Sequence, residues 1–290
     1  MSGGERAFIE ALRRIAAHPG ARGLEDDAAV LEFGGETLVL THDGMVEGVH
    51  FLPEQDAADV AWKLVATNMS DLAAKGAEPV GVLLGYTLGR DDARFLEGLE
   101  AALNHYGAPL LGGDTVSENG AQVLGLTAIG RATHRPVPAR SGARPGDGLW
   151  ITGAVGGAMM GFEALRDRSG GDSRAYRRPE ALLAEGQALA PHVTAMMDVS
   201  DGLLLDARRL ALASKVTCDI SPRAVPIAAP EVRRDDALRW GDDYQLLFTA
   251  APDAVLPVPA TWIGTISALT GSPLTLDGKE AGETGLGYEH

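Results

Sequence analysis

The chain has 290 residues, of which 45% are hydrophobic and 22% are charged, and its formal net charge at pH 7 is −15. This composition is typical of a globular protein with one large or two medium domains, and we favour two. The negative charge argues against a surface for nucleic acid or for an anionic membrane, because either polyanion would be repelled.

The single cysteine, Cys218, excludes an internal disulfide framework and a zinc site built from several cysteines. The first residues do not have the pattern of a signal peptide. The longest apolar runs, such as residues 80–88, are far shorter than the roughly 20 residues of a membrane span. We therefore expect a cytoplasmic protein with no membrane partner.

The first predicted elements are a helix and two strands. Apolar residues at helical spacing predict a helix over residues 5–17, and Asp26 and Asp27 then precede a short strand. Adjacent carboxylates repel, so this pair is either a solvated turn or a site for a cation. A second strand, residues 37–40, is followed by Asp43, which we expect where the strand end meets solvent.

A helix is predicted from about residue 59 to Lys75, with Gly76 as its C-terminal cap. Asp71 lies on the apolar stripe of this helix and should point inward. An unpaired buried carboxylate is costly, so Asp71 needs a metal ion or a hydrogen-bond network.

The next segments are a strand over 79–88, a helix over 91–106 and a strand from residue 109. We expect this last strand to break into a turn at Gly112 and Gly113, where a ligand could approach the backbone, with Asp114 at the strand end. A further strand covers residues 122–132. The order of elements predicts an α+β domain over 1–138, followed by a second domain over 139–290.

The second half opens with a strand over 149–152 and a glycine-rich run, 153–161, that leads into a helix. Backbone amides there could hold a phosphate, or the glycines could let the helix pack closely on the sheet. None of the four lysines stands in a Walker A context. Residues 170–178 are predicted to be a solvated surface loop, and the composition of residues 285–290 is typical of a disordered tail.

A short strand over 196–198 ends in a polar turn that contains Asp198, Ser200 and Asp201 and leads into a helix. Ser200 or Asp201 could cap this helix, but a cap accounts for only one of the polar side chains. Strands are also predicted over 216–220, 244–249 and 262–267.

The carboxylates at strand ends or beside glycines form one set, with Thr41 and Ser200 beside them. Oxygen ligands without groups of cysteine and histidine indicate a hard cation, above all Mg²⁺. Several Mg²⁺ ions could neutralise both reactants if a phosphate group attacked ATP, and Arg140 could add a contact to nucleotide phosphate. The set comprises Asp26, Asp27, Asp43, Asp71, Asp114, Asp198 and Asp201.

Six motifs, taken together and in order, closely resemble those of the thiamine-monophosphate kinase family, over nearly the whole chain. The resemblance implies the fold of aminoimidazole ribonucleotide synthetase. In that fold an N-terminal mixed-sheet domain forms a barrel in a homodimer, and a C-terminal α/β sandwich domain follows. It also implies direct transfer of the ATP γ-phosphoryl group to thiamine monophosphate with several Mg²⁺ ions. The motifs are residues 25–31, 41–51, 68–76, 112–115, 198–202 and 241–244.

The resemblance also implies roles for individual residues. The nucleotide contacts are Gly113, Asp114, Arg140 and Ser200. The contacts to thiamine phosphate are His50, Asp242 and Tyr288, which brings the tail into the site. Asp43, Asp71, Asp114 and Asp201 are the implied catalytic carboxylates. The implied Mg²⁺ ligands are Asp26, Thr41, His42, Asp43, Asp71, Asp114, Asp198 and Asp201.

This sequence departs from the family pattern at three positions. His42 stands where Thr or Ser is usual, so a metal contact there would come from the backbone oxygen. Glu25 replaces a Gly, and Asp242 replaces a Glu and shortens the substrate contact by one methylene. Two alternatives stay open: another ATP-dependent enzyme of the same superfamily, and a non-catalytic regulator that binds Mg²⁺ and nucleotide. The intact set of carboxylates disfavours the regulator.

Overall fold

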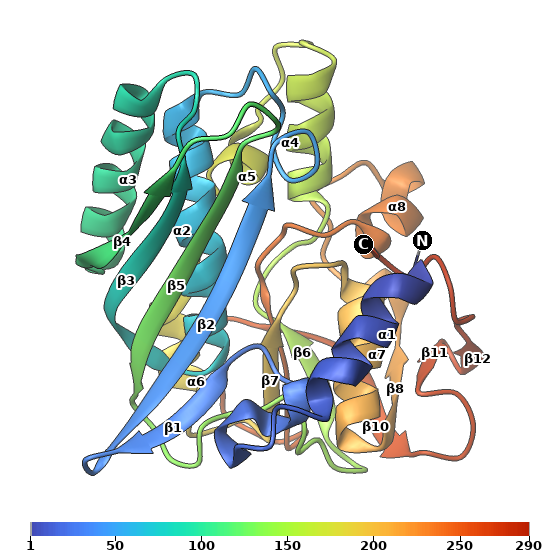
Figure 1. Cartoon of the computed structure of the whole chain (residues 1–290). Coiled ribbons are helices and arrows are strands. Elements are labelled where there is room, and N and C mark those ends of the chain that lie inside the picture. Colours follow the sequence, from blue (N-terminus) through green and yellow to red (C-terminus); the bar gives the residue numbers. More distant parts are fainter. Residues whose placement is uncertain (1, 290) are drawn as a thin grey trace.

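The computed structural model describes residues 2–289, with side chains from residue 8 onward. Two mixed β-sheets organise the chain, the first from its N-terminal half and the second from its C-terminal half (Figure 1). A helix, α1 (Ser2–Arg13), and a 3₁₀ helix, η1 (Pro19–Leu24), precede the first sheet.

The first sheet has the strand order β1-β2-β5-β3-β4, in which β3 and β4 run parallel and the other neighbours run antiparallel. Its inner face carries buried apolar residues at every second position, as the side-chain alternation of a strand requires. The strands are β1 (Ala29–Phe33), β2 (Glu36–Val46), β3 (Ala77–Thr87), β4 (Leu110–Val116) and β5 (Val123–Ala132).

Two helices cover the inner face of the first sheet. The first, α2 (Ala57–Ala74), begins where the Asp56 carboxylate accepts a hydrogen bond from the amide of Ala58 at 2.9 Å. The second, α3 (Asp92–Tyr106), packs on α2 and ends at Gly107, which adopts the left-handed conformation. Over the described residues, Figure 1 shows no helix on the opposite, outer face of this sheet.

The second sheet has the order β12-β11-β8-β10-β6-β9-β7. Its strands are β6 (Gly148–Ile151), β7 (Ala195–Asp198), β8 (Val216–Ile220), β9 (Leu246–Ala250), β10 (Thr261–Ala268), β11 (Leu274–Leu276) and β12 (Lys279–Glu280). The helices of this half are α4 (Gly157–Arg166), α5 (Arg174–Arg177), α6 (Leu183–Leu189), α7 (Leu203–Ser214) and α8 (Arg234–Arg239), with the 3₁₀ helices η2 (Pro222–Ala224) and η3 (Glu231–Arg233).

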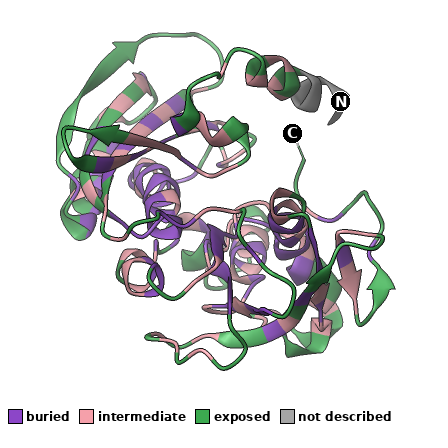
Figure 2. Cartoon of the chain, turned by 90° about the horizontal axis from the view of Figure 1, so that it is seen from below, coloured by how far each residue is buried: buried purple, intermediate pink, exposed green. Residues whose placement is uncertain are grey.

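The two halves share a core at the C-terminal end of α2. Ala73 and Ala74 of α2 pack with Leu189, Met196 and Phe248 of the second half, and all of these side chains are buried. Figure 2 shows buried residues gathered in the middle of the molecule and exposed residues on its outer surfaces. This shared core fixes α2 against β7, so residues from both halves can meet at one site.

The predicted ends of two strands were wrong. We expected the strand before Asp43 to stop there, but β2 continues to Val46 and pairs with β5 along this stretch. Likewise β4 runs straight through the expected glycine turn. A side chain at Gly113 would place its Cβ 1.9 Å from the carbonyl oxygen of Leu84, so the close approach that this glycine permits is to β3.

The prediction that residues 170–178 form a solvated loop is correct only for residues 170–173, which have no regular structure. Arg174–Arg177 form α5, and Tyr176 is buried. Arg177 and Arg178 make ion pairs with the buried carboxylate of Asp59, on α2. These two arginines therefore join the two halves, whereas Arg174 pairs with the nearby Asp172.

Every strand of the first sheet precedes residue 138 and every strand of the second follows it, while α6 of the second half packs on α2. The boundary at 138/139 stays a prediction. In the part of the chain that the structure describes, no helix is both long and apolar enough to cross a membrane.

Candidate active site

A cavity of about 650 Å³ lies where β2 and α2 meet the turns around β7 and β9. Most of the residues predicted for the site line it, although they come from positions 26 to 288 of the chain. The predicted residues that line the cavity are Asp26, Asp43, His50, Asp71, Arg140, Asp198, Ser200, Asp201, Asp242 and Tyr288.

Three carboxylates form the centre of this cavity. Asp27 lies just before β1, Asp71 lies on α2 and Asp198 ends β7, and each offers a ligand oxygen within 4.8 Å of the other two. The Asp27 Oδ2 atom is buried, and the ammonium nitrogen of Lys75 lies 2.6 Å from it. The short spacing of the three carboxylates from one another fits a bound cation.

The ionisation of these carboxylates supports the same conclusion. Burial, with the neighbouring Asp27 charge, raises the pKa of Asp198 to about 8. Burial, followed by the charges of Asp43 and Asp198, raises the pKa of Asp71 well above its usual value. Burial also raises the pKa of Asp43 to about 6. Without a cation these carboxylates resist ionisation, and a divalent ion such as Mg²⁺ would offset their repulsion.

The alternation of β2 decides which of its residues face the cluster. Thr41 and Asp43 point to the inner face, where the Thr41 hydroxyl donates a hydrogen bond to Asp71 and the Asp43 amide donates to Asn68 Oδ1 at 3.1 Å. His42 points to the outer face, and its Nδ1 lies 2.9 Å from the Thr127 hydroxyl. The structure therefore does not bring the His42 side chain to the cavity.

Gly113 and Asp114 are also absent from the cavity lining of this chain. They lie on β4, an exposed edge strand, and β3 and β5 separate it from β2. Asp114 is level with Gly85, Gly125 and Gly44 on the neighbouring strands, which places it on the outer face. The structure therefore does not bring these two residues to the cavity of this chain.

Lys75 is a member of the site that the sequence did not reveal. Its side chain is fully buried at the end of α2, and its ammonium lies 2.5 Å from Asp26 Oδ1 and 2.6 Å from Asp27 Oδ2. Arg140 Nε donates to the other oxygen of Asp27 at 2.6 Å. Burial alone would raise the pKa of Asp26, but Lys75 and Arg22 outweigh it and lower this pKa to about 2. Asp26 is therefore an ionised, paired carboxylate.

The polar turn after β7 is held by Asp206 of α7. This buried carboxylate accepts hydrogen bonds from the amides of Ser200 and Asp201 at 3.1 and 3.0 Å. Arg209 pairs with both Asp206, at 2.9 Å, and Asp201. Neither Ser200 nor Asp201 caps the helix, because Gly202 is the cap residue and makes no side-chain hydrogen bond. The helix instead fixes the turn.

The other side of the cavity holds the residues predicted for the acceptor. Val46 donates its amide to His50 Nδ1 at 3.0 Å, and Asp242 accepts from the buried Lys63 at 2.7 Å. The amide of Tyr288 donates to the Asp201 carbonyl at 2.8 Å. This bond ties the tail to the polar turn, so the tail lies at the site, as the resemblance implies.

Aromatic rings line this acceptor side, and sequence reasoning missed them. The Phe162 ring lies 5.2 Å from the Tyr176 ring and 5.3 Å from the Trp240 ring, measured between centroids, and all three line the cavity. They come from α4, α5 and the end of α8. Because these segments are distant in sequence, no local pattern could have grouped them.

The amides at the start of α4 do not face this cavity as a free anion site. The Asp243 carboxylate accepts from the amides of Gly156 and Ala158 at 2.6 and 3.1 Å. An internal carboxylate thus takes the place that we considered for a phosphate.

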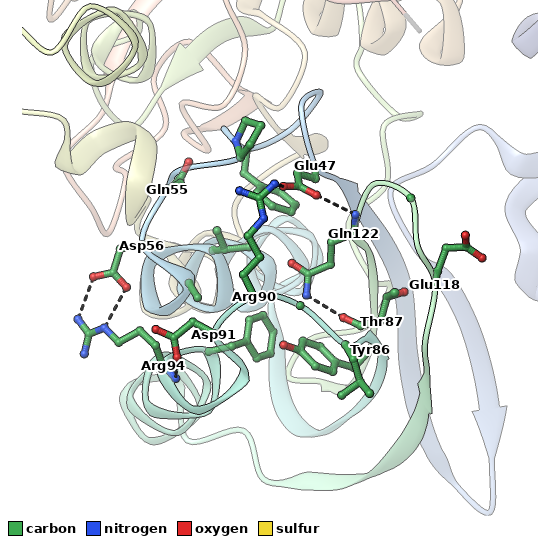
Figure 3. A pocket seen from close by; sticks show the side chains of 18 of the residues that line it. Glu47, Gln55, Asp56, Tyr86, Thr87, Arg90, Asp91, Arg94, Glu118 and Gln122 are labelled. Atoms are coloured by element: carbon green, nitrogen blue, oxygen red, sulfur yellow. Dashed lines mark hydrogen bonds and ion pairs between the residues drawn. The ribbon is translucent and has the colours of Figure 1, made fainter.

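A second cavity of about 610 Å³ lies among the loops that follow β2, β3 and β4 (Figure 3). Its main charges are already paired: Arg94 contacts both oxygens of Asp56 at 2.9 Å, and Glu47 accepts from the amide of Gln122 at 3.0 Å. The first cavity, which brings together three carboxylates from separate segments of the chain, is the better candidate.

The raised pKa values predict how stability depends on pH. Asp198 has a pKa near 3.8 when unfolded and about 8 when folded. Below the lower value it is neutral in both states. Between the two values, Asp198 is ionised in the unfolded state and still protonated in the folded state. The free energy of unfolding therefore decreases as the pH rises through this range. The pKa of Asp26 is lowered to about 2, so Asp26 changes the stability only at pH values below the unfolded pKa of Asp198.

In EDTA, the melting temperature should therefore decrease from about pH 5 to about pH 8.5, and the stabilisation by Mg²⁺ should grow over the same range. Thermal denaturation at several pH values, with and without Mg²⁺, measures both trends. A melting temperature in EDTA that rises with pH would contradict the ionisation described here.

Two family models and several known proteins match this chain. Residues 25–132 match the family model of the AIR synthase related protein N-terminal domain, and residues 144–260 match that of the C-terminal domain. The thiamine-monophosphate kinase of Salmonella typhimurium is 36% identical over 303 residues, which cover 92% of this chain and 91% of that protein. The thiamine-monophosphate kinase of Caulobacter vibrioides is 36% identical and covers 94% of this chain and 86% of that protein.

Solved structures of the same kind of protein have a similar fold. The structure of AaThiL complexed with AMPPCP and TMP has a TM-score of 0.88 at 28% identity and covers 98% of this chain and 97% of that one. Thiamine monophosphate kinase from Aquifex aeolicus has a TM-score of 0.82 at 27% identity and covers 95% and 97%. The two-domain α+β fold with two mixed sheets is therefore that of the AIR synthase related proteins. Within that group, the chain belongs to the thiamine-monophosphate kinase family.

Proposed function

We propose that this protein is a Mg²⁺-dependent kinase that transfers the γ-phosphoryl group of ATP directly to thiamine monophosphate, giving thiamine diphosphate and ADP. The observation that carries the proposal is the cluster of Asp27, Asp71 and Asp198, with oxygens within 4.8 Å of one another in a cavity of about 650 Å³. The relatives named above and the AaThiL complex with AMPPCP and TMP support the choice of substrates.

The carboxylates would hold Mg²⁺, with Asp43 and Asp201 beside the central three. The ion supplies positive charge that offsets the repulsion between the phosphates of donor and acceptor. Thr41 fixes Asp71 through its hydroxyl, and Asp206 and Arg209 fix Asp201. An acceptor phosphate is already ionised at neutral pH, so these residues need only bind and orient the two anions.

Arg140 and Ser200 are placed for the nucleotide. Arg140 lines the cavity with its guanidinium bound to Asp27, and Ser200 lies in the turn that Asp206 holds. A guanidinium beside the metal-binding carboxylates can pair with phosphate oxygens. These positions support the nucleotide contacts that the sequence predicts.

The acceptor side suits a cationic aromatic ring. The carboxylate of Asp242 lies in a cavity lined by Phe162, Tyr176, Trp240 and Tyr288. The thiazolium ring of thiamine carries a positive charge, which a carboxylate and aromatic faces attract.

The protein is also proposed to be a homodimer that joins through the outer face of the first sheet, forming a barrel. Leu83, Val116 and Val123 are exposed on this face at 40%, 53% and 51%. An apolar sheet face without a covering layer is typical of an interface. Asp114 lies on the same outer face, so a partner that covers this face would lie beside it.

Leu83→Glu should therefore convert the dimer into a monomer, because it places a charge within the apolar face. Light scattering after size-exclusion chromatography measures the mass. Val232→Glu is the matched control, since Val232 is 92% exposed on η3, away from this sheet. A wild-type protein that is monomeric at micromolar concentration would contradict the proposed interface.

The substrate assignment is tested by offering several acceptors. Purified protein is incubated with ATP and Mg²⁺ together with thiamine monophosphate or unphosphorylated thiamine, and the products are separated by chromatography. Thiamine diphosphate should form from the monophosphate, and unphosphorylated thiamine should not react. No product, with nucleotide still bound, would identify a regulator instead.

A further inference from the structure

We propose that Lys63 is a positioning residue for the phosphate acceptor: its ammonium group holds Asp242 and the turn of residues 48–50, here called the His50 loop, in place as one unit. The inference rests on the proposed function, because Asp242 and His50 are the predicted acceptor contacts. Lys63 itself belongs to no predicted contact, and the sequence gives it no role beyond a charge on a helix.

The surroundings of Lys63 are unusual for a lysine. It lies in α2 between Trp62 and Leu64, and it is only 1% exposed. Burial of an ammonium is costly unless the group is paired and hydrogen-bonded. The ammonium lies 2.7 Å from Asp242 Oδ2 and 3.1 Å from the His50 carbonyl oxygen, and it lies 4.0 Å from the centroid of the Tyr176 ring. Its contacts therefore join three separate segments of the chain.

Both oxygens of Asp242 are fixed by this arrangement. Lys63 donates to Oδ2, and the Tyr244 hydroxyl donates to Oδ1 at 2.8 Å. The backbone of Asp242 adopts a positive φ of 64°, and its amide donates to the Ser200 carbonyl at 2.8 Å. A non-glycine residue adopts this conformation when its surroundings hold it there. Asp242 thus has one defined orientation.

The His50 loop is held from the same point. The His50 carbonyl accepts hydrogen bonds from Lys63 at 3.1 Å and from the Tyr176 hydroxyl at 3.1 Å. Tyr176 lies on α5, in the second half of the chain, whereas His50 lies in the first. A single buried charge on α2 therefore sets the distance between the two acceptor contacts. Loss of that charge should loosen both contacts and leave the carboxylate cluster in place.

The test measures acceptor and nucleotide affinity separately by calorimetry. Lys63→Met keeps the aliphatic stem and removes the charge. We expect the Kd for thiamine monophosphate to increase at least about tenfold and the Kd for Mg²⁺–AMPPCP to change less than about twofold. Lys279→Met, at an exposed position on β12, is the matched control and should change neither.

A double-mutant cycle shows whether Lys63 acts through Asp242. If it does, the loss of binding free energy in the Lys63→Met/Asp242→Asn protein should be smaller than the sum of the two separate losses, and any loss beyond that of Asp242→Asn reports the contact of Lys63 with the His50 carbonyl. Full additivity would mean that Lys63 acts independently of Asp242 and would overturn the inference. Equal loss of affinity for acceptor and nucleotide, or no loss in Lys63→Met, would also overturn it.

Two further variants test the same role if the Lys63→Met protein does not fold. Lys63→Gln removes the charge but keeps a hydrogen-bond donor. Tyr244→Phe removes only the second hydrogen bond to Asp242 and should show the same selective loss of acceptor affinity. If the wild-type protein does not bind thiamine monophosphate at all, the proposed function fails as well. Wild-type binding with an unaffected Lys63→Met protein overturns the positioning role alone.

Discussion

Replacement of Asp71 by asparagine should lower kcat by about 1000-fold, equivalent to roughly 4 kcal/mol of transition-state stabilisation. Asp71 supplies one of the three clustered carboxylates, and asparagine keeps its shape but not its charge. The amide oxygen can still accept the hydrogen bond from Thr41, so the fold should be kept. Steady-state kinetics with saturating ATP and Mg²⁺ measures the loss.

The stability of the Asp71→Asn protein should not decrease in the way that its kcat does. Burial and the neighbouring carboxylates oppose the ionisation of Asp71, so removal of its charge should leave the metal-free protein at least as stable as the wild type. The stabilisation by Mg²⁺ should shrink. Asp253→Asn, at an exposed position, serves as the control for both measurements. A near-normal kcat in Asp71→Asn would remove Asp71 from the metal site.

Replacement of Lys75 by methionine should lower the free energy of unfolding by about 3 kcal/mol in EDTA, because a buried pair loses one partner. Lys75 is fully buried and lies within 2.6 Å of carboxylate oxygens of both Asp26 and Asp27. Arg22 and Arg140 still contact these aspartates, which limits the loss. Urea unfolding followed by circular dichroism measures the change.

Mg²⁺ should recover part of this loss, because a cation can replace the missing ammonium charge beside Asp27. The additional change Asp26→Asn should also recover part of it, since it removes a carboxylate that lost its partner. Lys279→Met is the control and should change stability by less than about 0.5 kcal/mol. A Lys75→Met protein as stable as the wild type would show that the buried pair is not needed.

The sequence predicted most of the carboxylates that line the cavity, although not all of those it grouped, since Asp114 lies elsewhere. Asp71 could be placed inward because it lies on the apolar stripe of a helix, and Asp43 and Asp198 could be grouped with it because their motifs resemble a known family. The structure brings all three to one cavity. The helices and most strands could be predicted because their apolar periodicity is regular.

The basic side of the site could not be predicted in the same way. Lys63 and Lys75 occur in a helix of mostly small and apolar residues, where a lysine is usually solvated at its tip. Lys75 pairs with Asp26, which lies 49 positions earlier, and Lys63 pairs with Asp242, which lies 179 positions later. Only the fold brings these partners together. Such pairs depend on tertiary contacts, and a single sequence does not record these contacts.

The errors at β2 and β4 have a different cause. Polar residues and glycines normally mark the end of a strand, but here cross-strand pairing overrides that preference. Asp43 stays within β2 because Leu126 of β5 pairs with it, and Gly113 stays within β4 because β3 approaches closely. The same alternation turns His42 away from the cluster, which no motif could reveal.

The most direct test of this account is ³¹P NMR of one reaction mixture containing the purified wild-type protein, ATP and thiamine monophosphate, recorded before and after addition of Mg²⁺. The account predicts no reaction in EDTA and, once Mg²⁺ is present, equal amounts of thiamine diphosphate and ADP. Release of ADP and inorganic phosphate without thiamine diphosphate, or formation of thiamine diphosphate in EDTA, would contradict it.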